Sequence, residues 1–385
     1  MPIMKPVRIL LALVLALALL LSDSRLSAQT CPRNGADIAS LADQVKHATD
    51  ADTLFRATAI GGKDLVPTLR LLSKPDMAVN TLPGAAQVSL AKLGYKEYAD
   101  QLERELNGKS PYGAVGKLVR IGNDQAISIL MTFVVAHWHD DSLRHDFGDY
   151  SEDMRYEILR LVSKQLQIGP LISPRDFSVS IDDWVAWWNR NKGKPIALSI
   201  SGRLRDPYLQ CLARKVEWGF PDAILDMANT GNAEVLPVLG ILERVGPQDF
   251  TLKTIHGRAQ FGLAKLGDEE SFRAIVRDLD VGYYGESPEA LRMIGGRKAV
   301  AALVNALTSP EFAHYHLSWK NAGPEAVATS ERQRDNLIIS ALTAIVADPP
   351  QVTGDLKHQE TQWADWWTKN QDTAHFVSIP VKQYE

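Results

Sequence analysis

Two short histidine motifs are the residues of this chain whose type and spacing first suggest metal chemistry. "AHWH" (136–139) carries two histidines at alternate positions, and "AHYH" (313–316) repeats the pattern. The first motif is followed by "DDSLRHDFGDY", which adds a third histidine and several carboxylates. Imidazole nitrogen and carboxylate oxygen together form a usable zinc ligand set, and bound zinc activates water. The candidate metal ligands are His137, His139, His145 and Asp141.

A second interpretation of the same motifs requires no metal. Side chains two positions apart on a helix diverge, so His137 and His139 can share a metal only on non-helical backbone. The second copy, with His314 and His316, is followed by "LSWKNAG" and lacks the carboxylates. These features favour a repeated helix end whose imidazoles cap carbonyl groups or pack against neighbours.

The N-terminal residues have the pattern of a secretory signal peptide. Lys5 and Arg8 precede the apolar run "ILLALVLALALLL", and the small residue Ala28 suits cleavage before Gln29. The run is too short for a comfortable membrane span of about 20 residues. We therefore expect residues 1–28 to be removed and the mature chain to be periplasmic or secreted, with no transmembrane segment.

The amino-acid composition excludes few classes of protein, but it indicates a globular chain. Hydrophobic residues make up 45% and charged residues 23% of the sequence, as in folded soluble proteins. The formal net charge of -4 gives no sequence-wide reason to expect nucleic acid or an anionic membrane as partner. The sequence contains no G-x-S-x-G, H-E-x-x-H, P-loop or C-x-x-C motif. We assign no catalytic residue and no cofactor.

The chain has two cysteines, Cys31 and Cys211. Export to an oxidising compartment permits a disulfide between them, which would tie the N-terminal end of the mature chain to its middle. Two unpaired thiols are equally compatible with the sequence.

The histidine motifs belong to a longer internal repeat. "AAQVSLAKLG" (85–94) and "RAQFGLAKLG" (258–267) are identical at seven of ten positions, with an offset of 173 residues. Other matched pairs follow in chain order at offsets from 170 to 179. An ordered series of this kind predicts a tandem duplication, with one copy at residues 36–200 and the other at residues 205–376.

Within each copy, paired amphipathic segments separated by glycine predict an all-α fold. Three segments resemble units of the HEAT-repeat family, in particular its HEAT-like variant: residues 86–108, 259–279 and 289–307. The resemblance implies an α-α superhelix, in which each helical pair buries its apolar face against its neighbours. It indicates a fold and does not indicate a function.

Each copy closes on a tryptophan-rich segment, "WVAWWNRN" (184–191) or "WADWWTKN" (363–370). The spacing i, i+3, i+4 places each trio on one helical face. We expect these helices to cap the superhelix, with the first and last tryptophan of each trio packed most deeply. The alternative is an exposed aromatic platform for sugar or peptide. The trios are Trp184, Trp187 and Trp188, and Trp363, Trp366 and Trp367.

Two functions of different classes follow from these features. The first is an exported, non-enzymatic scaffold that binds a protein or peptide on its helical surface. The second is a metal-dependent hydrolase that uses the histidine and aspartate cluster at residues 137–146.

Overall fold

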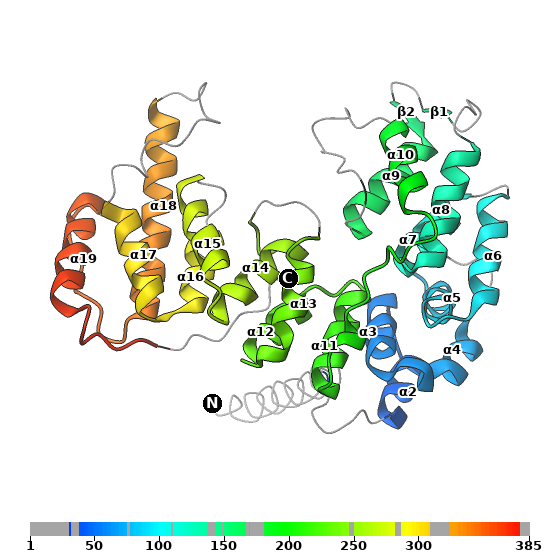
Figure 1. Cartoon of the computed structure of the whole chain (residues 1–385), viewed down its shortest axis with the longest axis horizontal. Helices are drawn as coiled ribbons and strands as arrows, with labels where there is room; N and C mark the ends of the chain where they lie inside the picture. Colours follow the sequence, from blue (N-terminus) through cyan, green and yellow to red (C-terminus); the bar gives the residue numbers. More distant parts are fainter. Residues whose placement is uncertain are drawn as a thin grey trace, which may run out of the picture. The chain divides into compact units, whose positions relative to one another are not determined.

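Among the residues that the structure describes, the protein is all-α apart from one small hairpin and one isolated bridge (Figure 1). The computed structural model describes residues 31, 38–74, 78–108, 111–137, 144–147, 150–166, 169, 181–245, 250–281, 286–308 and 324–377. None of the described helices is both long enough and apolar enough to cross a membrane. The chain divides into two compact units, residues 1–220 and 221–385.

In the first unit, the helices pack in two rows that follow chain order. One row runs α3–α5–α7–α9, and in the other α2 packs on α4 and α6 on α8. The hairpin β1–β2 is antiparallel and pairs Arg144 with Asp153. The elements are α2 (Ile38–Lys46), α3 (Ala51–Gly61), η1 (Gly62–Leu65), α4 (Val66–Leu72), α5 (Leu82–Lys92), α6 (Lys96–Leu106), α7 (Pro111–Ile121), α8 (Asp124–Ala136), β1 (Arg144–Phe147), β2 (Tyr150–Asp153), α9 (Met154–Leu161), η3 (Val162–Leu166), α10 (Ile181–Asn191), η4 (Ser201–Arg203) and α11 (Pro207–Glu217).

The second unit repeats this order of elements. Its rows are α12–α14–α16–α18 and α15–α17–α19. A 3-10 turn precedes a short helix with proline near its start in both units, at η1–α4 and at η5–α13. The elements are α12 (Asp222–Asn229), η5 (Ala233–Val235), α13 (Leu236–Leu242), α14 (Ile255–Lys265), α15 (Glu269–Val281), α16 (Glu286–Ile294), α17 (Gly296–Thr308), α18 (Pro324–Ile345) and α19 (Leu356–Asn370).

Helix α5 lies at the centre of the first unit and helix α14 at the centre of the second. The motif "LAKLG" stands at the end of both helices. Residues 84–91 of α5 and 256–264 of α14 are continuously buried, because neighbouring helices pack around the whole circumference. Each helix begins at a threonine whose hydroxyl accepts a hydrogen bond from the amide three residues later, Thr81 from Gly84 and Thr254 from Gly257. Gly94 and Gly267 follow with positive φ, which stops each helix at the same point.

Cys31 and Cys211 form a disulfide, with Cα atoms 5.8 Å apart. The bond ties Cys31 to α11, which also packs on α3. These contacts explain why the first unit extends to Phe220, although the second sequence copy begins near residue 205. The boundary between the two units therefore lies one helix beyond the predicted start of the second sequence copy.

The buried tryptophans support the expected packing of the two trios, with one correction. Trp184 and Trp363 are completely buried, and Trp188 is 6% exposed. Trp367 is only partly buried, so the prediction that the last tryptophan packs as deeply as the first is wrong for the second trio. In α10 and α19 alike, the first indole meets the second edge-on, at ring-centroid distances of 5.5 and 5.6 Å.

Gly169 explains how the first trio is accommodated. Its φ is +77°, and a Cβ atom at this position would lie 2.4 Å from the Trp184 ring. The backbone therefore contacts the indole directly, which only glycine allows. The two helices end alike: the amides of Asn191 and Asn370 donate to the carbonyls of Trp187 and Trp366.

Removal of the disulfide is expected to destabilise the protein. Because the bond restricts the unfolded chain over a separation of 180 residues, Cys211→Ser should lower the free energy of unfolding by about 2–4 kcal/mol. Urea unfolding of oxidised protein measures this change. Reductant should lower the midpoint of the parent and leave that of Cys211→Ser unchanged. Two reactive thiols in non-reduced, folded protein would contradict the bond.

The second stability prediction compares two tryptophans of one helix. Trp184→Ala should lower the free energy of unfolding by about 3–5 kcal/mol, because it leaves a cavity at a fully buried position. Trp187→Ala should cost clearly less, because that indole is partly exposed. Equal losses of thermal stability in the two variants would show that burial does not distinguish these positions.

Candidate functional site

The first histidine motif lies where α8 ends. His137 follows the last residue of α8, and its Nδ1 is 2.9 Å from the Phe133 carbonyl oxygen. Its ring lies 4.3 Å from the Phe133 ring, and its own carbonyl accepts a hydrogen bond from Arg155. These contacts agree with the helix-end interpretation of His137.

The side chains of the remaining candidate ligands of the predicted metal site lie outside the described part of the structure. His139 and Asp141 lie outside the described residues, and His145 is described only as backbone on β1. The second motif, with His314 and His316, also lies outside them. Within the described part of the chain, no three histidine, cysteine or carboxylate side chains are grouped as metal ligands. The metal site stays a prediction.

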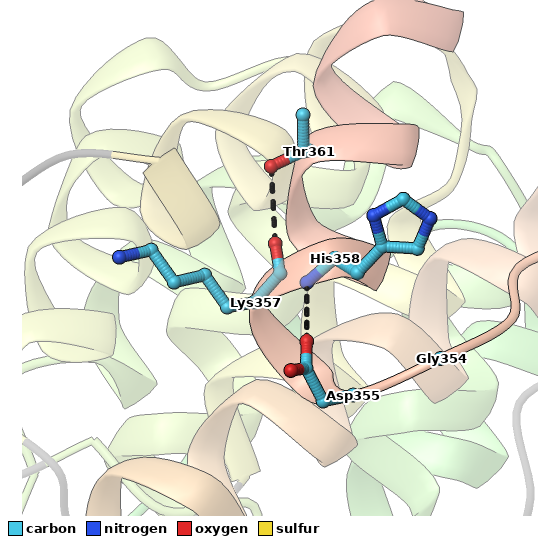
Figure 2. A pocket seen from close by; sticks show the side chains of 5 residues that line it. All are labelled: Gly354, Asp355, Lys357, His358 and Thr361. Atoms are coloured by element: carbon cyan, nitrogen blue, oxygen red, sulfur yellow. Dashed lines mark hydrogen bonds between the residues drawn. The ribbon is translucent and has the colours of Figure 1, made fainter.

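A small hollow at the start of α19 has polar side chains that do not converge (Figure 2). The Asp355 carboxylate accepts from the amide of His358, and the Lys357 carbonyl accepts from the hydroxyl of Thr361. Figure 2 shows the Lys357 and His358 side chains extending away from each other. Both hydrogen bonds drawn in Figure 2 lie within the first turns of α19, so this hollow is a weak candidate for a binding site.

The second unit contains a larger groove, of about 730 Å³, between α13, α14 and α15. Its wall includes the apolar side chains of Phe250 and Leu263. Most of the lining is polar and includes the side chains of Glu243, His256, Gln260, Asp268, Ser271 and Asp278. A groove with an apolar wall and several hydrogen-bonding groups is the usual form of a binding site.

The charge of the lining is predominantly negative. Glu243, Asp268, Glu270 and Asp278 contribute carboxylates, whereas the cations are Arg244 and Arg277. The hydrogen bond from the backbone amide of Ser271 lowers the pKa of Asp268, so this group stays ionised. Arg244 donates through Nε to the Gly240 carbonyl on its own helix, which holds its guanidinium near the backbone.

His256 supplies a hydrogen-bond acceptor to this region. It is 3% exposed, and its Nδ1 contacts the Glu243 carbonyl oxygen. A carbonyl only accepts, so Nδ1 carries the hydrogen and Nε2 keeps its lone pair. Nε2 is buried and has no hydrogen-bond partner among the described residues. An unsatisfied buried polar atom of this kind costs about 1–3 kcal/mol.

The hydrogen bonds of Ser271 serve a structural role and do not prepare its hydroxyl for nucleophilic attack. Its amide donates to the Asp268 carboxylate at 2.8 Å, which caps the start of α15. Its hydroxyl donates to Glu243 at 3.3 Å. Among the described contacts, no hydrogen bond joins Ser271 to His256, so the serine–base pair that activates a nucleophile is not formed. The polar side chains of the groove are suited to hydrogen bonding with a bound ligand.

The equivalent region of the first unit is built differently. At the offset of 173 residues, proline, tyrosine and tyrosine replace His256, Asp268 and Ser271: they are Pro83, Tyr95 and Tyr98. Arg70 lies over the Tyr95 ring at 5.0 Å and pairs with Glu97. Sequence reasoning missed the groove, although this departure from the repeat at residues 256, 268 and 271 was visible as a difference between the copies.

Comparison with known proteins assigns no relative. No family model, no curated protein and no solved structure matches the chain.

A cluster of cations and aromatic rings in the first unit has a different character. Lys92 Nζ lies 5.5 Å from the Trp218 ring and donates to the Arg120 carbonyl. The Arg120 guanidinium lies 4.6 Å from the Phe55 ring and pairs with Asp52 at 3.4 Å. Burial, together with the charge of Arg120, lowers the pKa of Lys92 to about 7.

This pKa predicts a pH dependence of stability. Between pH 7 and 10.5 the unfolded chain holds a proton on Lys92 that the folded chain has lost, so stability rises with pH across this interval. Below pH 7 the cost of enclosing the ammonium is fully present. Lys92→Met should therefore stabilise the protein at pH 6 by about 1 kcal/mol, and the difference should shrink towards pH 10. Urea midpoints measured at both pH values test this, and Lys63→Met, at an exposed lysine, is the control.

Proposed function

We propose that this chain is an exported, non-enzymatic HEAT-like scaffold that binds a segment of a protein or peptide partner in the groove between α13, α14 and α15. The observation that carries the proposal is the groove itself, with its apolar wall, its ionised carboxylates and the unpartnered acceptor of His256. Such a lining suits an extended segment that presents amide and side-chain donors.

The superhelical part of the proposal is supported by packing that follows chain order. In the row α3–α5–α7–α9 of the first unit and the row α12–α14–α16–α18 of the second, each helix contacts the next helix of its row. The other row of each unit lies beside it. This arrangement of neighbours is the one that α-solenoids use.

The tandem duplication is supported by the parallel order of elements. The segment α2 to α10 corresponds to α11 to α19, helix by helix, among the described elements. Thr81 and Thr254 cap equivalent helices, and Trp184 and Trp363 are buried at equivalent positions.

Export is supported by the pattern of residues 1–28 and by the disulfide. A bond between Cys31 and Cys211 persists in an oxidising compartment and is rare in a reducing cytosol.

A peptide array tests the proposed function. Purified chain, fluorescently labelled, is applied to immobilised nine-residue peptides of varied sequence, and affinities of the best binders are measured in solution. We expect binding that Glu270→Lys weakens at least tenfold, because the variant reverses a charge in the lining. The matched control is Asp365→Lys, at an exposed carboxylate of α19 outside the groove, which should leave affinity unchanged. Absence of any binder, or equal affinity of the two variants, would refute the proposal.

A further inference from the structure

Three basic side chains of the first unit gather around the turn that follows α11. Arg56 comes from α3, Lys92 from the end of α5 and Arg120 from α7. The centroid of the Phe220 ring lies 4.5 Å from the Arg56 guanidinium carbon and 5.5 Å from that of Arg120. Lys92 reaches the Trp218 ring of the same turn. The three cations therefore share one region, and all of them are half-buried.

Few carboxylates face these cations. Asp52 of α3 pairs with Arg120 at 3.4 Å, and its side chain is 70% exposed. Both carboxylate oxygens of Glu217 accept hydrogen bonds from the segment that precedes α11. Within the described part of the chain, neither Arg56 nor Lys92 forms an ion pair. Aromatic rings attract cations but carry no net charge, so this region keeps an excess of positive charge.

Lys117 shows how the first unit compensates another lysine with its own side chains. It is 1% exposed, and its Nζ donates to Gln87 Oε1 and to Glu105 Oε2, each at 3.0 Å. The Nζ of Lys92 instead donates to a backbone carbonyl, that of Arg120. A neutral carbonyl does not neutralise an ammonium, so the charge of Lys92 is left without a carboxylate at contact distance.

Enclosing these cations together is unfavourable. Burial, and next the charge of Arg120, lowers the pKa of Lys92 to about 7 against the opposing charge of Glu217. Burial also lowers the pKa of Arg120, an effect that Asp52 opposes and Arg56 increases. Each cation therefore makes its neighbour less favourable, and a bound anion would counteract this effect for all three.

The second unit shows that packing of the equivalent helices does not require the cations. At the offset of 173 residues, Lys265 corresponds to Lys92 and Met293 to Arg120. Met293 is 2% exposed, and α14 packs on α16 as α5 packs on α7. Lys265 donates to Asn229 Oδ1 at 2.8 Å. An apolar side chain suffices at the second position, so the charge of Arg120 is not needed for packing.

We propose that Arg56, Lys92 and Arg120 form a binding site for the phosphate group of a phosphate monoester. A dianion balances the excess charge better than one carboxylate does, and guanidinium and ammonium donors match its several oxygens. Arg214, whose Nε donates to a carbonyl of α3, adds a further cation nearby. Gly219 is exposed, and a Cβ atom there would lie 3.3 Å from Arg120 Nη1, so glycine leaves this guanidinium uncrowded.

The experiment uses the full chain with its disulfide formed. Isothermal titration calorimetry at pH 7 and constant ionic strength measures binding of glycerol 3-phosphate, with succinate and acetate as carboxylate comparisons. The variants are Arg56→Gln, Lys92→Met and Arg120→Met, the last of which introduces the residue that the second unit has. The matched control is Arg70→Gln, because this arginine also lies over an aromatic ring and pairs with an exposed carboxylate, outside the cluster.

We expect glycerol 3-phosphate to bind at least about tenfold more tightly than either carboxylate, and each cluster variant to weaken it by at least about tenfold. Arg70→Gln should leave the affinity unchanged. Circular dichroism and urea midpoints verify that the variants are folded, and Arg56→Gln, at a half-buried position, keeps the test decisive if Arg120→Met unfolds.

Two results would overturn the proposal. Absence of saturable binding, or an equal loss in Arg70→Gln, would show that these cations form no specific site. Succinate binding as tight as that of glycerol 3-phosphate would remove the assignment to phosphate. Neither result bears on peptide binding, because the groove belongs to the second unit and the two proposals are independent.

A second measurement distinguishes the two sources of a phosphate monoester, a soluble metabolite and a lipid headgroup. Cosedimentation compares vesicles of phosphatidylcholine with and without phosphatidic acid. Binding to phosphatidic acid that glycerol 3-phosphate displaces and Arg120→Met abolishes would identify a lipid headgroup. Binding of the soluble ester without vesicle binding would identify a soluble ligand, and both results support the site.

Discussion

Helices α5 and α14 are enclosed on all sides by the other helices of their units. A helix whose residues are continuously enclosed cannot be stable alone, because its apolar surface would face water. It requires helices on both sides along the row and a second row beside it. The repeated "LAKLG" ends both helices at a glycine, so that the chain turns and places the next helix against the same surface.

This enclosure also explains why polar residues inside the two units are informative. A lysine as deeply buried as Lys117 is tolerated because Gln87 and Glu105 meet its ammonium. The ammonium is therefore held inside the first unit by side chains of two neighbouring helices, α5 and α6.

The disulfide and α11 show that sequence repetition and packing need not share a boundary. Cys211 belongs to the second copy by sequence, yet its helix packs on α3 and is bonded to Cys31. The cation and aromatic cluster of Lys92, Arg120 and Trp218 adds contacts at the same place. Contacts between residues far apart in the chain, and not the repeat, decide where the first unit ends.

The all-α class and the deep burial of Trp184 and Trp363 could be predicted from the sequence. These features follow from periodicity, capping residues and spacing, which act over a few neighbouring residues. Three other features could not be predicted in this way: Trp367 stays partly exposed, α11 joins the first unit, and His256, Gln260 and Asp278 line one groove. The reason is that each of these depends on which side chains from separate helices meet, and a linear pattern does not specify that meeting.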